Sequence, residues 1–357
     1  HRLFADLLHR RLGHSSPDLV PELHRRASLW HEQQGLMSEA IDHALAAGAY
    51  ERAAQLIEGA AEATLMRSEL ATLLNWIEGL PDGWECAYPL LCVYHAWALL
   101  FSGRSLDAVE RRLAFLEGQN DLLAGKEAPL RAFIAVFRGD MSGVAAWSRE
   151  ALEQLAEEDL FLRGFARWLL GIAGMLSGDW ESGQQALDEV VTASQEAGNV
   201  MLAVMVLCSQ AELSMKQGGL HKAQAIYQRA LEGAADGRGE RLPVAGVALL
   251  GLGELSREWN DLEAAERQIC QGIERVGGWA EAWAIDGYIS LAHVRHAQGV
   301  PEGARTAIQT ARQLAAQFEA TELDELRPGA DLRVATAGAF ERLLDHISVH
   351  RYYMGID

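Results

Sequence analysis

An internal repeat of about 40 residues constrains the fold of this chain more than any other feature. Successive repeat positions are 36, 39, 40, 41 and 40 residues apart, and they lie at Gly103, Gly139, Gly178, Gly218, Trp259 and Gly299. A fixed period of about 20 to 50 residues is the sequence signature of stacked repeats. The 357 residues are therefore predicted to form an elongated array rather than one compact core.

Small residues recur at fixed distances from these turn positions. Seven residues before them the series runs Ala96, Ala132, Gly171, Ala211, Leu252 and Ala292, and five residues after them it runs Ala108, Val144, Gly183, Ala223, Ala264 and Ala304. Two helices that approach closely need small side chains at the point of contact. Each repeat is therefore predicted to be a helical hairpin, with a left-handed turn at the repeat position. Asp179, Asn260 and Asp261 are predicted to cap the helices that follow the turns.

The predicted fold class is all-α. Only eight prolines occur, apolar residues recur at helical spacing, and no segment shows the alternation expected of strands. One hairpin cannot bury its own apolar faces, so neighbouring hairpins must stack into a solenoid, predicted to be a right-handed superhelix.

This pattern of small residues around a turn resembles the tetratricopeptide repeat (TPR). The clearest copies are residues 207–231 and 289–314. The standard unit has about 34 residues, so this TPR-like repeat is longer by most of a helical turn per helix.

The first sixty residues resemble a narrower family. The segments 1–12, 21–39 and 40–57 are similar to the sequence that joins the winged-helix module to the sensor module in large ATP-dependent LuxR-family transcription regulators of the maltose-regulon-activator type. The resemblance implies a superhelical sensor domain, flanked in the whole protein by a nucleotide-binding module and a helix-turn-helix module. ATP is expected to bind only to that nucleotide-binding module, because this chain has no GxxxxGK[ST] phosphate loop.

The expected boundaries follow from the resemblance and the period. Residues 1–12 are expected to be the last helix of a preceding winged-helix module, and 13–80 to be N-terminal helical repeats or a cap. A loop is predicted at 81–89, six TPR-like hairpins at 90–318, and a C-terminal helix or cap at 319–357.

Composition limits the partners of this chain. The formal net charge is -19, from 31 Lys and Arg against 50 Asp and Glu, so direct contact with nucleic acid is not expected. No apolar stretch reaches the roughly 20 residues needed to cross a membrane. The four cysteines have neither CxxC pairing nor the dense spacing of secreted disulfide proteins, which favours a cytoplasmic protein.

Enzymatic activity is not predicted for this chain. The sequence contains no HExxH, GxSxG, CxxC or GxGxxG motif. The pair His293 and His296 would lie on one helix face, but metal binding would need a further ligand from a neighbouring helix.

The concave face of the superhelix is the predicted binding surface, lined by positions three, six, ten and thirteen before each repeat position. The candidate ligand-binding residues are Trp97, Phe133, Trp168, Met175, Glu212, Ser256, Asp286, His293 and His296. The first hypothesis is a sensing and oligomerisation domain of a transcription activator, with a small inducer in the groove. The alternative is a scaffold that binds a protein or peptide without an inducer. Self-association is left open.

Overall fold

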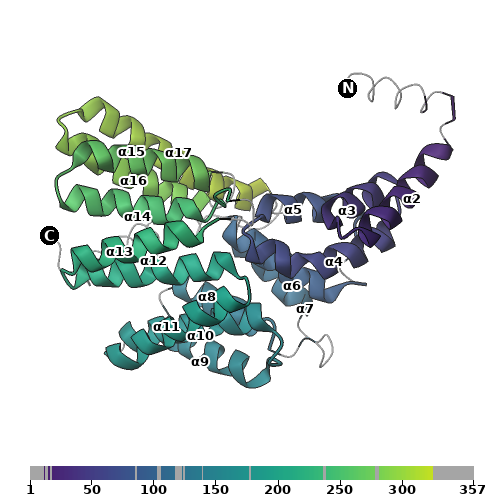
Figure 1. The fold of residues 1–357 in the computed structure, drawn as a ribbon, viewed down its shortest axis with the longest axis horizontal. Coiled ribbons are helices and arrows are strands. Elements are labelled where there is room, and N and C mark those ends of the chain that lie inside the picture. The colour runs from purple at the N-terminus through teal and green to yellow at the C-terminus, as the bar shows by residue number, and fades with distance from the viewer. Residues whose placement is uncertain are drawn as a thin grey trace.

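The chain forms an all-α solenoid in this computed structural model (Figure 1). The structure describes residues 18–84, 87–102, 106–116, 125–138, 140–176, 178–235, 239–277 and 281–324, together with single positions 12, 15, 16 and 123. Within these ranges the only β-type pairing is an isolated bridge between Ala235 and Arg241.

The helices follow one another along the whole described chain. Their bounds are α2 Leu19–Gln33, α3 Met37–Ala46, α4 Tyr50–Met66, α5 Leu70–Glu78, α6 Pro89–Phe101, α7 Leu106–Leu116, α8 Ala128–Phe137, α9 Met141–Gln154, α10 Leu160–Leu176, α11 Trp180–Glu196, α12 Val200–Lys216, α13 Leu220–Gly233, α14 Ala245–Glu258, α15 Leu262–Val276, α16 Glu281–Ala297 and α17 Pro301–Asp324.

Six antiparallel hairpins make up the regular part of the solenoid, from α6/α7 to α16/α17. The two helices of each hairpin contact each other, and first helices of successive hairpins also touch, as α12 touches α14 and α14 touches α16. The predicted stacking of hairpins is therefore confirmed. The predicted domain limits stay expectations, because residues 1–11 and 325–357 lie outside the described part.

The turns at Gly178, Gly218 and Gly299 share one hydrogen-bond pattern, whereas the predicted turn positions Gly103 and Gly139 lie outside the described residues. Gly178, Gly218 and Gly299 have φ values of 98°, 77° and 76°. The amide after each turn residue reaches back to a carbonyl five residues earlier, as from Gly219 to Ser214 at 2.8 Å. This left-handed turn closes the first helix and satisfies its last carbonyls.

The second helix of several hairpins begins with a side-chain cap. The Asp179 carboxylate accepts a hydrogen bond from the amide of Ser182, and the Asp261 carboxylate accepts one from the amide of Ala264. The predicted caps at Asp179 and Asp261 are confirmed, and each satisfies an amide that the helix itself leaves unpaired. The cap predicted at Asn260 was wrong, because Asp261 caps α15.

The fifth turn lies one residue later than predicted. Trp259 has an ordinary φ of -84°, whereas Asn260 has a φ of 59°. The amide of Asp261 accordingly donates to the carbonyl of Ser256 at 2.9 Å. The prediction at Trp259 was wrong because Asn, which tolerates the left-handed region, replaces Gly at this turn.

The corrected register places small residues where α14 meets α15. A Cβ on Gly246 would lie 2.8 Å from the carbonyl oxygen of Gly272, and one on Gly253 would collide with Ile269. The two helices therefore approach each other along their backbones. The position seven before the turn is Gly253, not the predicted Leu252.

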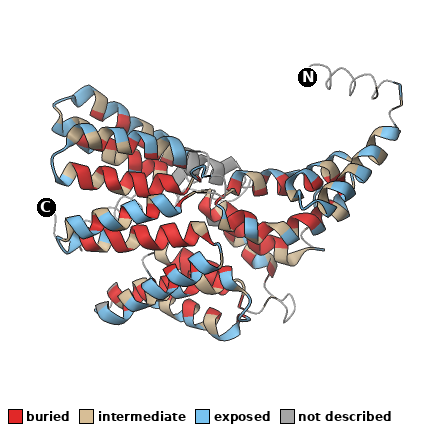
Figure 2. Ribbon diagram, in the orientation of Figure 1, coloured by how far each residue is buried: buried red, intermediate tan, exposed pale blue. Residues whose placement is uncertain are grey.

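The solenoid curls enough for distant helices to meet. Helix α12 contacts α4, although α5 and the three hairpins from α6/α7 to α10/α11 lie between them along the chain. Residues are buried on almost every side of α6 and α12, as the red colouring of α12 shows in Figure 2. A helix that is apolar all round needs neighbours all round, so protein surrounds α6 and the first two turns of α12, from Met201 to Cys208.

Candidate ligand-binding groove

The predicted groove residues separate into two sets in the structure. Trp97, Phe133, Trp168 and Met175 are buried, with 0%, 9%, 7% and 2% of their surface exposed. The prediction that they line an open groove was wrong. Their positions face inward as expected, but the curl of the chain covers them.

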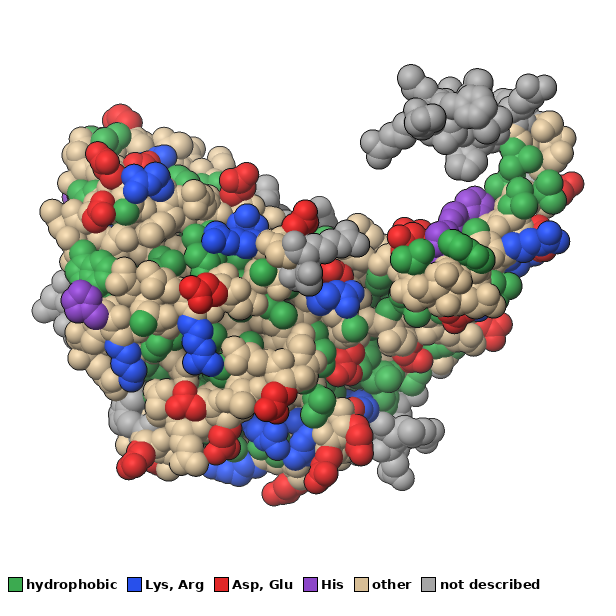
Figure 3. Space-filling model, viewed as in Figure 1, with side chains coloured by type: hydrophobic (Ala, Val, Ile, Leu, Met, Phe, Trp, Pro, Cys, Tyr) green, Lys and Arg blue, Asp and Glu red, His purple; other side chains and the backbone are tan. Residues whose placement is uncertain are grey.

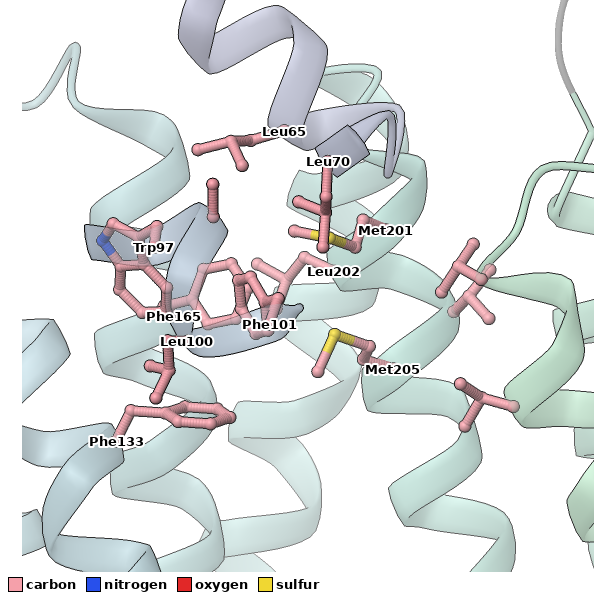
Figure 4. Packing of buried hydrophobic residues seen from close by; sticks show 14 of the residues in the cluster. Leu65, Leu70, Trp97, Leu100, Phe101, Phe133, Phe165, Met201, Leu202 and Met205 are labelled. Atoms are coloured by element: carbon pink, nitrogen blue, oxygen red, sulfur yellow. The ribbon is translucent and has the colours of Figure 1, made fainter. Parts of the chain in front are cut away.

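Trp97, Phe133 and Trp168 belong to an aromatic core inside the superhelix, and Figure 4 shows Trp97 and Phe133 in it. The ring of Trp97 lies 4.6 Å from that of Phe165 and 6.0 Å from that of Phe133, while Phe133 and Trp168 are 6.0 Å apart. The indole N–H groups of Trp97 and Trp168 have no hydrogen-bond partner among the described residues. Stacked and edge-to-face rings of this kind are typical of packing.

Ser256 also lies away from the groove. It is 8% exposed, and its hydroxyl is 2.8 Å from the side-chain oxygen of Gln268 on α15. The one-residue register error at Asn260 explains this correction, because the true concave positions of α14 are three and six before Asn260. These are Arg257 and Glu254.

Glu212, Asp286, His293 and His296 are exposed to solvent, and the repeat register places them on the concave face of α12 and α16. This predicted half of the groove is therefore open. No bound molecule tests which of these residues contact a ligand, so their binding role stays a prediction.

Sequence reasoning missed the charged pair on α14. Glu254 and Arg257 form an ion pair at 2.9 Å, and Arg257 also contacts Glu258 at 2.6 Å. One carboxylate oxygen of Glu254 is buried and has no partner among the described residues. Reading Asn260 as the turn residue would have found both side chains.

The carboxyl groups of α12 and α16 influence each other electrostatically. The surrounding protein and then the Glu212 carboxylate raise the pKa of Asp286 to about 7. The surrounding protein raises the pKa of Glu212. The positive charge of Lys216, one turn along α12, acts in the opposite direction and lowers it. Both side chains are exposed to solvent.

Two surface hollows in the described residues border α15. One is lined by Arg241, Pro243, Gln271, Glu274 and Arg275. It is open to solvent, and the guanidinium group of Arg275 already donates to the carbonyl of Arg241 at 3.1 Å. We therefore favour the concave face as the candidate site.

Three histidines gather at the N-terminal end of the solenoid. The Nδ1 atoms of His24 and His43 are 2.8 Å apart, and the rings of His31 and His43 stack at 5.1 Å. Burial, followed by the charges of His24 and His31, lowers the pKa of His43. Among the described residues, no group of three or more His, Cys, Asp or Glu side chains has the geometry to hold a metal ion.

The described helices also include no candidate membrane span. Figure 3 shows acidic and basic side chains scattered over the visible face of the molecule, without a large basic patch. This surface does not resemble the basic face that nucleic-acid binding requires.

These observations define a class of protein: an all-α repeat domain with a long, curled superhelix and a partly polar concave face. Residues 125–343 match the MalT-like TPR region. The match covers more than half of the chain, and the chain belongs to this family.

Two curated relatives with different names each match most of this chain. The serine/threonine-protein kinase PknK of Mycobacterium tuberculosis is 29% identical over 355 residues, which cover 94% of this chain and 32% of the kinase. The HTH-type transcriptional regulator MalT of Cronobacter sakazakii is 26% identical over 313 residues, covering 86% and 34%. The chain thus spans about a third of the length of these relatives.

A solved structure has the same fold. It is a signal transduction ATPase with numerous domains (STAND) and a tetratricopeptide repeat sensor, from Pyrococcus horikoshii. The two chains are 12% identical with a TM-score of 0.52, covering 94% of this chain and 53% of the other. At this identity the likeness concerns the fold alone.

Proposed function

We propose that this chain is the effector-sensing and protein-interaction domain of a cytoplasmic bacterial regulator. A small inducer binds on the open half of the concave face, between α12, α14 and α16. The observation that carries the proposal is the set of charged groups there, Glu212, Glu254, Arg257 and Asp286, on an otherwise apolar helix stack. Polar groups that converge in an apolar, concave setting are typical of ligand sites.

The sensor is proposed to act on other modules of a longer protein. In the relatives, a kinase name and a transcriptional-regulator name accompany the same helical region. An ATPase module and a DNA-binding module are the partners that the LuxR-family resemblance favours, and ATP would bind only to the former. The inducer must bind the active arrangement more tightly than the resting one, because only differential affinity shifts a conformational equilibrium.

The proposal is tested by thermal unfolding of the 357-residue chain with sugars, short-chain metabolites and aromatic compounds. An inducer at about 100 times its Kd stabilises the folded state by about 2.7 kcal/mol. The shift should disappear in Arg257→Gln or Glu212→Gln and persist in Arg229→Gln on α13, an exposed cation outside the groove. A shift that all three variants retain would place the ligand elsewhere.

A second candidate function is docking of a protein partner on α2. Leu19, Leu23 and Trp30 follow one face of this helix and are 45%, 40% and 55% exposed. Exposed apolar residues that follow one another on a surface mark interaction sites, so this stripe favours an interaction. Leu23→Glu with Trp30→Glu should abolish capture of that partner, or self-association on gel filtration, without changing an inducer-dependent thermal shift.

A further inference from the structure

Three histidine rings pack together where helix α2 meets helix α3, at the N-terminal end of the solenoid (Figure 1). His24 and His31 belong to α2, and His43 belongs to α3. The Nδ1 atoms of His24 and His43 are 2.8 Å apart, and the ring centroids of His31 and His43 are 5.1 Å apart in a stacked pair. Figure 3 shows histidine side chains at this end of the molecule. The three rings therefore form part of the contact between α2 and α3.

This arrangement suits neutral rings and not fully protonated ones. A hydrogen bond between two Nδ1 atoms holds one proton, so one ring donates and the other accepts with an unprotonated nitrogen. If both His24 and His43 were protonated, two N–H groups and two positive charges would face each other across 2.8 Å. The Nδ1 atom of His31 is buried and has no hydrogen-bond partner among the described residues, so a charge on this ring adds to the cost.

The balance of charges around His43 favours its neutral form. Burial, followed by the charges of His24 and His31, lowers the pKa of His43. Asp42 and Glu39, on α3 itself, act in the opposite direction with smaller effects. The folded state therefore binds fewer protons here than the unfolded chain does. The stability that this contact provides is lost as the pH falls below the ordinary His value of 6.5.

Two acids beside the histidines already have partners on other helices. The Asp42 carboxylate accepts a hydrogen bond from the indole N–H of Trp76 on α5 at 3.1 Å. Glu32 on α2 forms an ion pair with Arg52 on α4 at 2.6 Å. Both carboxylates are thus engaged elsewhere, which limits how far they can neutralise protonated histidines.

Helix α2 is held on the solenoid mainly by polar contacts. Ser28 is the one residue of Leu19–Gln33 that is buried, and its hydroxyl accepts a hydrogen bond from Arg52 at 3.1 Å. Leu23 and Trp30 are instead 40% and 55% exposed. A helix with so few buried apolar contacts lies at the low end of local stability, so a change of charge at its interface is enough to undock it.

We propose that His24, His31 and His43 form a histidine latch, which holds α2 on α3 at neutral pH and releases it in mild acid. Histidine is the side chain whose ordinary titration falls between pH 5 and 8, and release lets water solvate each charged ring. The apolar stripe on α2 moves with the helix, so its presentation to a partner changes as well. The latch goes beyond the proposed sensing function and does not depend on the concave groove.

The test is hydrogen exchange of the 357-residue chain, measured by mass spectrometry at pH 7.5 and at pH 5.5. Protection factors are compared, because they remove the intrinsic pH dependence of amide exchange. Protection of α2 should fall by about tenfold or more at pH 5.5, since two unit charges about 5 Å apart repel by at least that factor near a protein surface. Protection of α10, which contains no His, Asp or Glu, should stay the same.

Two variants separate the latch from general sensitivity to acid. His43→Asn places an amide near the position of Nδ1 and does not titrate in this range, so α2 should keep its protection at pH 5.5. His221→Asn removes a histidine of α13 that contacts Trp259 at 5.4 Å, and this variant should respond to acid as the wild type does. The latch would be overturned if α2 and α10 lost protection together, or if His43→Asn kept the wild-type response.

A measurement on the wild type covers the case in which His43→Asn itself undocks α2. Slow exchange of the ring Cε1 hydrogen reports the titration of each histidine separately. His43 should titrate below its ordinary pKa of 6.5, and α2 should lose protection in the same pH range. Titration of His43 at or above 6.5, or release of α2 while all three rings are neutral, would contradict the latch.

Discussion

Trp97 stabilises the fold through the aromatic rings that enclose it. Its indole stacks on Phe101 at 5.2 Å and meets Phe161 and Phe165 at 5.6 and 4.6 Å. Trp97→Ala removes these contacts and leaves a cavity in a rigid core, so we expect a loss of about 3 to 5 kcal/mol in the free energy of unfolding. Urea unfolding followed by circular dichroism measures this loss.

Trp259 provides the matched control for Trp97. It is 37% exposed and contacts the ring of His221 at 5.4 Å. Trp259→Ala should change the free energy of unfolding by less than about 1 kcal/mol, because little apolar surface is lost from the core. Similar losses in the two variants would contradict the burial pattern of the aromatic core.

Asp286 should make stability depend on pH near neutrality. Its pKa is about 7 in the folded chain, against an ordinary value of 3.8 for Asp. The folded state therefore binds more protons between pH 4 and 7, so this group's contribution to stability decreases as the pH rises through that window. Asn cannot ionise, so the Asp286→Asn variant avoids this loss of stability. The difference in Tm between the variant and the wild type should therefore be larger at pH 8 than at pH 6, with the variant more stable.

The control for this pH effect is Glu157→Gln. Its side chain is exposed in the turn between α9 and α10, so its Tm difference from the wild type should be the same at both pH values. Differential scanning calorimetry gives the comparison. If Asp286→Asn showed no greater advantage at pH 8, Asp286 would not be held near Glu212 in the way the structure shows.

Helices α14 and α15 depend on glycines that let their backbones approach. A Cβ on Gly272 would lie 3.0 Å from the carbonyl oxygen of Gly246, and one on Gly246 would lie 2.6 Å from Val276. Gly246→Ala should therefore separate the helices and cost about 1 to 3 kcal/mol by overpacking. Chemical unfolding measures this cost.

Gly59 on α4 tests whether the cost comes from packing. It is helical, and a Cβ there would meet nothing within 4 Å. Gly59→Ala should stabilise the chain by about 0.5 to 1 kcal/mol, because alanine loses less backbone entropy in a helix. If both substitutions had the same sign, close approach of α14 and α15 would not be what selects glycine.

Contact between α4 and α12 distinguishes this molecule from an open solenoid. In an open solenoid each repeat contacts only its neighbours, and a local defect stays local. Figure 4 shows Leu65 and Leu70 near the end of the aromatic cluster where α12 brings Met201 and Leu202. The curl thus couples hairpins that are far apart in sequence.

This coupling predicts a distant response to a local change. Leu65 is fully buried on α4, so Leu65→Ala should speed amide exchange in α12 as well as in α4. Val294→Ala on α16, also fully buried, should act mainly on α14 to α17. Hydrogen exchange measured by mass spectrometry tests this prediction. If Leu65→Ala left the protection of amides in α12 unchanged, the contact between α4 and α12 would be contradicted.

The sequence predicted the hairpins well because their signals are local. Gly178, Gly218 and Gly299 mark turns that need a left-handed backbone, and Asp179 and Asp261 cap the helices that follow. The fifth turn was misplaced by one residue, since Asn260 can take that conformation too. Because of this shift, the predicted groove included the buried Ser256 and left out Glu254 and Arg257.

The sequence by itself determined the all-α class, the period and which side of each first helix faces inward, because turn geometry and helical spacing act within one repeat. Only the tertiary structure decided which inward positions are open. Small rotations between hairpins add up until α12 reaches α4, and this sum covers Trp97 and Phe133 while Glu212 and Asp286 stay in contact with water. No residue encodes that curvature alone, since it results from every interface along the stack.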